Sequence, residues 1–82
     1  MSLLQRDARI ADCIAASFPC RVKPQMNVHT DSKIDAESII SVISTVGRYE
    51  VESADGVTED GRAVCWFAAG PFSVFYPGDD AA

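Results

Sequence analysis

Apolar residues recur at two different spacings along this chain, and the spacing predicts which segments are helices and which are strands. Residues 3–17 carry an apolar stripe at helical spacing, and Pro19 ends that segment. The apolar residues of 35–46 also fall at helical spacing, and Gly47 suits a left-handed C-terminal cap. The pattern therefore predicts amphipathic helices over 3–17 and 35–46.

Strict alternation of apolar and polar residues takes over between the two helices. From Cys20 to Thr30 every odd position is polar and most even positions are apolar, which predicts one long strand with a single buried face. Pro24 cannot donate to a strand ladder, so it places this strand at an edge or limits pairing to its second half. Residues 48–53 alternate again, with Tyr49 inward, and predict a second strand.

The stretch 62–76 supplies two more strands, which the dipeptide Gly70-Pro71 joins in a tight turn. Before it, Asp55-Gly56 and Asp60-Gly61 both have the composition of turns. We expect Trp66, the only tryptophan, to face the helices, because so small a sheet needs its largest apolar side chain in the core. The alternative places Trp66 on the outer sheet surface as a binding anchor.

Together these segments predict a two-layer α+β fold. The order is α-β-α-β-β-β, with a mainly antiparallel four-stranded sheet and both amphipathic helices on one face. The last three strands form an antiparallel meander, and the first strand reaches the same sheet through a crossover that contains the second helix. Residues 1–78 are expected to form a single small domain, and residues 79–82 a flexible acidic tail.

Composition supports a small globular protein of the reducing cytoplasm. The chain has 82 residues, and its 48% apolar content suits a folded core rather than disorder. No apolar run approaches a membrane span, and the N-terminus lacks the pattern of a secretory signal. Three cysteines are an odd number without metal-ligand spacing, which favours free thiols; a disulfide between Cys13 and Cys20 is the alternative.

Charge divides the chain into two unlike parts. Residues 1–33 hold five basic and three acidic side chains, a balance of +2, whereas residues 34–82 hold two basic and nine acidic ones, a balance of −7. The acidic residues of the second part follow one strand and its loop, so we expect them to share an edge of the sheet. Together they form the candidate partner-binding surface: Glu50, Glu52, Asp55, Glu59 and Asp60, with Asp79 and Asp80 in the tail.

A second candidate surface is the polar side of strand 20–30. Arg21, Lys23 and His29 fall on that side and could meet phosphates. The −7 balance of the meander opposes direct nucleic-acid binding, and its aromatic residues are expected in the core rather than stacked on bases.

Catalytic chemistry finds little support in the sequence. His29 is the sole histidine, and no nucleophile or second titratable group has a fixed place beside it. No histidines, cysteines or carboxylates occur at the spacing of a known metal site, and the glycines fall in turns rather than in a phosphate-binding loop. We therefore expect a protein without enzymatic activity, cofactor or metal.

In size and charge the chain resembles the small acidic inhibitors that phages and plasmids direct at host machinery, such as anti-CRISPR and anti-restriction proteins. The resemblance rests on size and net charge, and no sequence motif supports it. It implies a binding protein whose acidic surface occupies a basic groove on a protein partner and blocks or regulates it. Two alternatives remain: a small nucleic-acid-binding regulator that uses the basic strand face, and an interaction module that dimerises through a strand edge.

Overall fold

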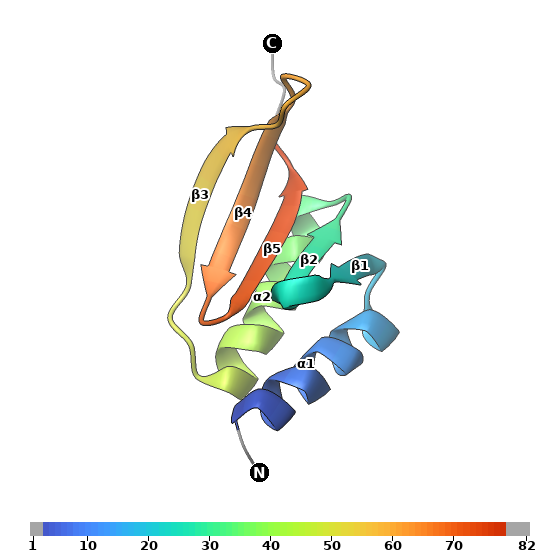
Figure 1. The fold of residues 1–82 in the computed structure, drawn as a ribbon, viewed down its shortest axis with the longest axis vertical. Helices are drawn as coiled ribbons and strands as arrows, with labels where there is room; N and C mark the ends of the chain where they lie inside the picture. Colours follow the sequence, from blue (N-terminus) through green and yellow to red (C-terminus); the bar gives the residue numbers. More distant parts are fainter. Residues whose placement is uncertain (1–2, 79–82) are drawn as a thin grey trace.

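The computed structural model describes residues 3–78, which form two helices and one five-stranded sheet (Figure 1). In chain order the elements are α1 (Leu3–Ser17), β1 (Cys20–Lys23), the short 3-10 turn η1 (Pro24–Met26), β2 (Asn27–Thr30), α2 (Lys33–Gly47), β3 (Glu52–Val57), β4 (Ala63–Ala69) and β5 (Phe72–Pro77). The predicted tail, 79–82, lies outside the described residues.

The sheet is mixed. Its strands lie in the order β1-β2-β5-β4-β3; β2 and β5 run parallel, and the other neighbouring pairs are antiparallel. The α+β class and the antiparallel meander of the last three strands are confirmed. The predicted four-stranded, mainly antiparallel sheet is wrong, because the segment 20–30 contributes two strands and the element order is α-β-β-α-β-β-β.

The extra strand arises at η1, where the chain reverses. Gln25 and Met26 both adopt left-handed backbone conformations, with φ of 65° and 58°, and the chain folds β2 back onto β1. Each cross-strand pair joins two even or two odd positions, for example Val22 with Val28. Paired residues of antiparallel strands point to the same side, so the hairpin keeps the alternation that one long strand would have.

Both predicted helices are confirmed. At the start of α2, Ser32 is the N-cap, and its hydroxyl accepts a hydrogen bond from the backbone N–H of Asp35 at 3.4 Å. At the other end the left-handed residue is Arg48, with φ of 57°, and not Gly47 as predicted.

The second predicted strand, over residues 48–53, begins four residues later than expected and is β3 of the structure. β3 begins at Glu52, so Tyr49 belongs to the loop before it, and Asp55-Gly56 continues the strand instead of turning. The turn is at the second dipeptide, where Gly61 has φ of 82° and the backbone N–H of Thr58 donates to the Arg62 carbonyl at 2.8 Å.

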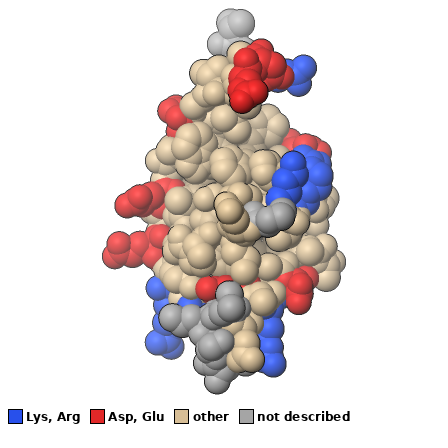
Figure 2. All heavy atoms as spheres, viewed as in Figure 1, with Lys and Arg blue, Asp and Glu red and all other residues tan. Residues whose placement is uncertain are grey.

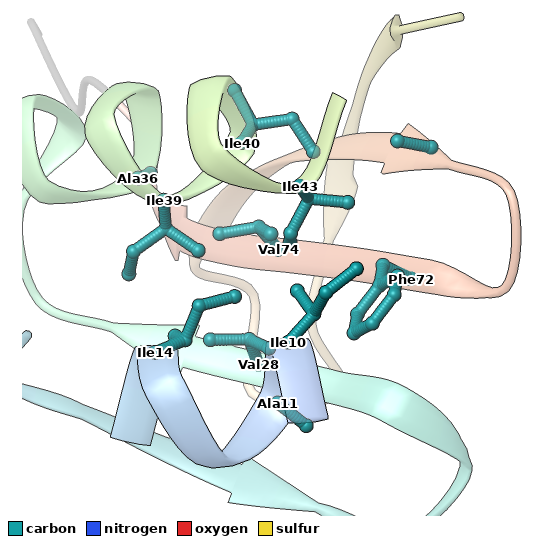
Figure 3. Packing of buried hydrophobic residues seen from close by; sticks show 11 residues of the cluster. Ile10, Ala11, Ile14, Val28, Ala36, Ile39, Ile40, Ile43, Phe72 and Val74 are labelled. Carbon is teal, nitrogen blue, oxygen red and sulfur yellow. The ribbon is translucent and has the colours of Figure 1, made fainter. Parts of the chain in front are cut away.

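The core lies between the helices and one face of the sheet (Figure 3). Phe72 and Val74 of β5 are fully buried there. Trp66 is not a member of this cluster, so the expectation that it faces the helices is wrong. The buried apolar residues are Ile10, Ala11, Ile14, Val28, Ala36, Ile39, Ile40, Ile43, Ala69, Phe72 and Val74.

Tyr49 ties the first helix to the loop after the second. Its hydroxyl donates to both carboxylate oxygens of the buried Asp7, at 2.9 and 3.0 Å, and accepts from Arg6 Nη2 at 3.1 Å. Its ring fills the space above two glycines: a Cβ at Gly47 or at Gly70 would lie 2.5 Å from a ring carbon. Nothing in the sequence pattern pairs Tyr49 with Asp7, because 41 residues separate them and only the tertiary fold brings them together.

Candidate functional site

One face of the sheet carries no helix of the described residues 3–78, and we call it the open face. Successive side chains of a strand point to opposite faces. Because Phe72 and Val74 point into the core, Ser73 and Phe75 point to the open face. Paired residues share a face, so the pairing of Trp66 with Phe75 and of Phe75 with His29 puts all three there. We call His29, Phe75 and Trp66 the aromatic row; Arg21 on β1 and Ala54 on β3 extend it to the two edges of the sheet.

The three rings of the aromatic row are in contact. His29 stacks on Phe75 with ring centroids 4.8 Å apart and 14° between planes, and Trp66 meets Phe75 at 5.8 Å and 40°. On its other side the indole lies over Gly56, where a Cβ would sit 3.3 Å from the ring. All three side chains are partly exposed. The row is therefore an ordered apolar strip with one side facing outward.

A second, more polar row runs beside the aromatic row. The registers align Lys23, Asn27, Ser73, Ala68 and Glu52 across the five strands, again on the open face. Lys23 and Glu52 are both exposed and lie at opposite edges of the sheet. The open face is thus basic at the β1 edge, acidic at the β3 edge and uncharged between them.

Figure 2, seen from the side of the open face, shows acidic residues along the left margin, where β3 lies, and basic ones to the right of a broad uncharged area; further basic residues lie at the lower end on both sides, and further acidic ones at the top and on the right.

The predicted basic residues come together as expected. Arg21 and His29 are cross-strand partners, and Lys23 follows on the same side of β1. Arg21 Nη2 lies 3.4 Å from Asp31 Oδ1, which offsets part of its charge. The pKa of His29 is lowered from its ordinary value, first by burial and then by the charges of Lys23 and Arg21. At neutral pH this ring is therefore uncharged, and the positive charge of the surface comes from Arg21 and Lys23.

A shallow hollow of about 230 Å³ lies beside the stacked rings. Arg21 and Arg62 both line it, which suggests an anion site. Each guanidinium, however, already has a carboxylate partner, since Arg62 Nε lies 3.4 Å from Asp60 Oδ2 and Arg21 is paired with Asp31. The hollow is therefore close to neutral and makes a poor site for an isolated anion.

The five predicted acidic residues are all exposed and follow the β3 edge, as the sequence predicts. Glu52 shares the open face with Ala68, whereas Asp55 pairs with Cys65 and points to the opposite side. Glu50 precedes the strand, and Glu59 and Asp60 follow it. Asp60 accepts a hydrogen bond from Thr58 Oγ1 and is paired with Arg62, so it is the most constrained of the five. Asp79 and Asp80 lie outside the described residues.

The arrangement of thiols and the histidine does not form a nucleophilic pair. Cys20 pairs with the buried Thr30 and Cys65 pairs with Tyr76, which packs on the core, so both point away from the face that carries His29. The three cysteines are free, with Cys13 exposed on α1. Burial raises the pKa of the Cys20 thiol, which favours its protonated form over the nucleophilic thiolate.

Two further findings concern the described part of the chain. No three histidine, cysteine or carboxylate side chains within it come close enough to hold a metal ion. None of its helices combines the length and hydropathy that a membrane span requires.

Sequence reasoning missed Phe75 and misplaced Trp66. A signal for both was present, because the Gly70-Pro71 turn pairs Ala69 with Phe72 and thereby Trp66 with Phe75. If Phe72 points into the core, Phe75 points to the opposite face, and Trp66, its cross-strand partner, lies on that face too.

Comparison with protein-family models, curated proteins and solved structures found no match to this chain. The function is therefore inferred from the geometry of the open face and of the β3 edge.

Proposed function

We propose that this chain is a non-enzymatic protein that binds a basic surface of a macromolecular partner through the β3 edge and so blocks or regulates that partner. The observation that carries the proposal is the exposure of five carboxylates along one free edge of the sheet: Glu50, Glu52, Asp55, Glu59 and Asp60. Negative charge gathered in this way attracts Lys- and Arg-rich grooves, including those that normally hold nucleic acid.

The edge offers two kinds of contact at once. Since β3 pairs only with β4 among the described strands, its other side presents backbone donors and acceptors to an incoming segment. Glu52 and Asp55 project to opposite faces of that edge. An extended basic segment of the partner could therefore add as a further strand, with its lysines and arginines meeting carboxylates on both sides.

Capture from a lysate tests this proposal. The wild-type chain is immobilised beside a Glu50→Lys/Asp55→Lys variant, and captured proteins are identified by mass spectrometry. A control variant, Asp12→Lys/Glu37→Lys, makes the same change in charge on exposed helical positions. Wild type and control should retain the same partner, and the edge variant should lose it. Undiminished capture by the edge variant contradicts the proposal.

The free thiols support the proposed cytoplasmic location, because a reducing compartment keeps cysteines unpaired. The mode of action proposed here is that of the small phage- and plasmid-type inhibitors, which the chain resembles in size and charge.

Binding of single-stranded nucleic acid is a second candidate function, and the aromatic row favours it. Bases stack on aromatic side chains of exposed sheets, and Trp66 and Phe75 lie on such a face with Arg21 and Lys23 at one edge. The acidic β3 edge opposes it. An oligonucleotide titration at low salt decides: quenching of Trp66 fluorescence that weakens in an Arg21→Ala/Lys23→Ala variant supports this function, and unchanged emission excludes it.

A further inference from the structure

The open face has the properties of a surface that another protein covers. Trp66 and Phe75 contribute aromatic area at its centre, and Val64 and Ala68 continue the apolar strip along β4. A sheet normally buries such a face against a second layer. Here both helices pack on the other side, and no second layer covers the open face within residues 3–78.

We propose that this layer is a second copy of the same chain. Two open faces pack against each other about a twofold axis that runs parallel to the strands, midway between the two sheets. The inference goes beyond the proposed function, because it uses the open face; of the five carboxylates of the β3 edge it engages only Glu52.

The position of the charges selects this axis. β5 is the central strand of the five, with the basic β1 edge on one side and the acidic β3 edge on the other. A twofold axis parallel to the strands lays the β1 edge of one copy over the β3 edge of the other, so unlike charges meet. An axis across the strands would lay β1 over β1 and β3 over β3, where like charges repel.

The cross-strand registers then assign the contacts. In the polar row, Lys23 of one copy faces Glu52 of the second copy, and the contact occurs twice in the dimer. In the aromatic row, Phe75 lies on the axis and His29 faces Trp66 of the second copy. Packed sheets keep their strand directions within about 30° of each other. The strands near the axis therefore lie almost directly over each other, so the aromatic residues of the two copies are in close contact. The edge strands are displaced further from each other, and the long side chains of Lys23 and Glu52 span that distance.

The size of the face sets the expected strength. The five strands have four to seven residues each; at about 4.8 Å between strands and roughly 3.3 Å per residue they give a face of about 20 Å by 18 Å, which is shorter at the β1 edge. That footprint is smaller than a standard specific interface and belongs to the range of weak, transient complexes. We therefore expect a weak, reversible dimer with a Kd in the micromolar range or above.

Sedimentation equilibrium over a range of concentrations, with four variants, tests the dimer. Lys23→Glu and Glu52→Lys should each raise the dimer Kd by at least about tenfold, because each places like charges opposite one another in both contacts. Mixing the two single variants should restore association as a heterodimer, and the double variant Lys23→Glu/Glu52→Lys should dimerise as wild type does. The control Asp55→Lys changes a charge on the side of β3 that faces away from the proposed interface, and it should leave the dimer Kd unchanged.

Emission of the single tryptophan gives an independent measurement. It should shift to the blue as the wild-type concentration passes the Kd, and Trp66→Ala should abolish association while circular dichroism stays native.

A wild-type chain that remains monomeric at every concentration overturns the proposal, as does a mixture of the folded single variants that fails to associate. A dimer that survives Trp66→Ala also overturns it and points to edge pairing, and a monomer whose tryptophan is quenched by oligonucleotide assigns the face to nucleic acid. The capture test changes Glu50 and Asp55, and the dimer test changes Lys23 and Glu52, so either proposal can fail without the other.

Discussion

Trp66 and Phe72 are large aromatic residues on neighbouring strands, but they stabilise the fold to different degrees. Phe72 is fully buried between the sheet and the helices, whereas Trp66 lies partly exposed on the open face. Loss of a buried ring removes its transfer free energy and leaves a cavity, and loss of a half-exposed ring leaves none.

We expect Phe72→Ala to lower the free energy of unfolding by about 3–5 kcal/mol, which is most of the stability of so small a domain. Trp66→Ala should cost about 1–2 kcal/mol. Urea denaturation at a concentration well below the proposed dimer Kd measures both. A loss at Trp66 equal to that at Phe72 would mean that the indole lies in the core after all.

His29 should make stability depend on pH. Burial, followed by the charges of Lys23 and Arg21, lowers its pKa in the folded chain below the ordinary value of 6.5. The unfolded chain then binds the proton more readily, so acid favours unfolding. Stability should be unaffected by this group above pH 6.5, fall as pH drops from there to the folded pKa, and show no further change from His29 below it.

Urea denaturation of wild type and of His29→Gln at pH 7 and at about pH 5.5 measures this contribution. Carboxylates titrate in both proteins, so the comparison isolates His29. The variant should lose less stability on acidification than wild type does. An equal loss in the two proteins contradicts a depressed pKa at His29.

Among the elements, those defined by periodicity were predictable and those defined by turns were less so. Both helices follow from apolar spacing, and the last two strands follow from an apolar stretch that the Gly70-Pro71 turn divides. The β1–β2 hairpin did not, because its pairing preserves the alternation of a single strand and only Pro24 signals the interruption. Asp55-Gly56 has the composition of a turn, yet pairing with β4 and the indole above Gly56 hold it in a strand. Tertiary contacts thus overrode local preference.

The η1 turn is a point of backbone strain that can be relieved. Gln25 is exposed and has φ of 65°, a conformation that costs a residue with a Cβ about 1 kcal/mol and glycine almost nothing. Gln25→Gly should leave stability unchanged or raise it by up to about 1 kcal/mol, the gain being reduced by the greater freedom of glycine in the unfolded chain. Gln25→Val is the control, because a β-branched side chain tolerates a positive φ poorly. It should lower the free energy of unfolding in urea denaturation by at least about 1 kcal/mol. A marked loss in Gln25→Gly contradicts the hairpin.

The contact between Tyr49 and Asp7 joins α1 to the loop between α2 and β3. Tyr49→Phe keeps the ring but removes the hydroxyl that donates to a buried carboxylate, which should cost about 1–3 kcal/mol. Because the two side chains are direct partners, the double variant Asp7→Ala/Tyr49→Phe should lose less than the sum of the single losses. Strictly additive losses in urea denaturation would show that the hydroxyl and the carboxylate do not interact.

Across the whole molecule, we expect the protection of backbone amides from hydrogen exchange to decrease from the centre of the sheet toward β3. β5 is flanked by strands on both sides and covered by α2, whereas β3 is an edge strand whose main packing partner is β4. Amide hydrogen exchange should therefore be slowest in β5 and fastest in β3 and the turn after it. Equal protection of β3 and β5 at low protein concentration contradicts this gradient.

The layout of the candidate surfaces was only partly predictable. Alternation alone places Arg21, Lys23 and His29 on one side and the carboxylates along one strand. It does not say which side the helices cover, because both faces of β4 are largely apolar. That choice depends on the register across the Gly70-Pro71 turn and on the volume of Phe72, which are properties of the assembled fold.

The Tyr49 ring makes distant positions of the chain dependent on one another. A methyl group at Gly47 would collide with the ring, so alanine there is tolerated only if residue 49 becomes smaller. Where such a replacement has happened, the hydroxyl partner of Asp7 is lost as well, and within residues 3–78 the buried carboxylate keeps only its ion pair with Arg6. Sequences descended from a common ancestor with this fold should therefore change at positions 7, 47 and 49 together. Such correlated substitutions would reveal the contact among these positions from sequences alone.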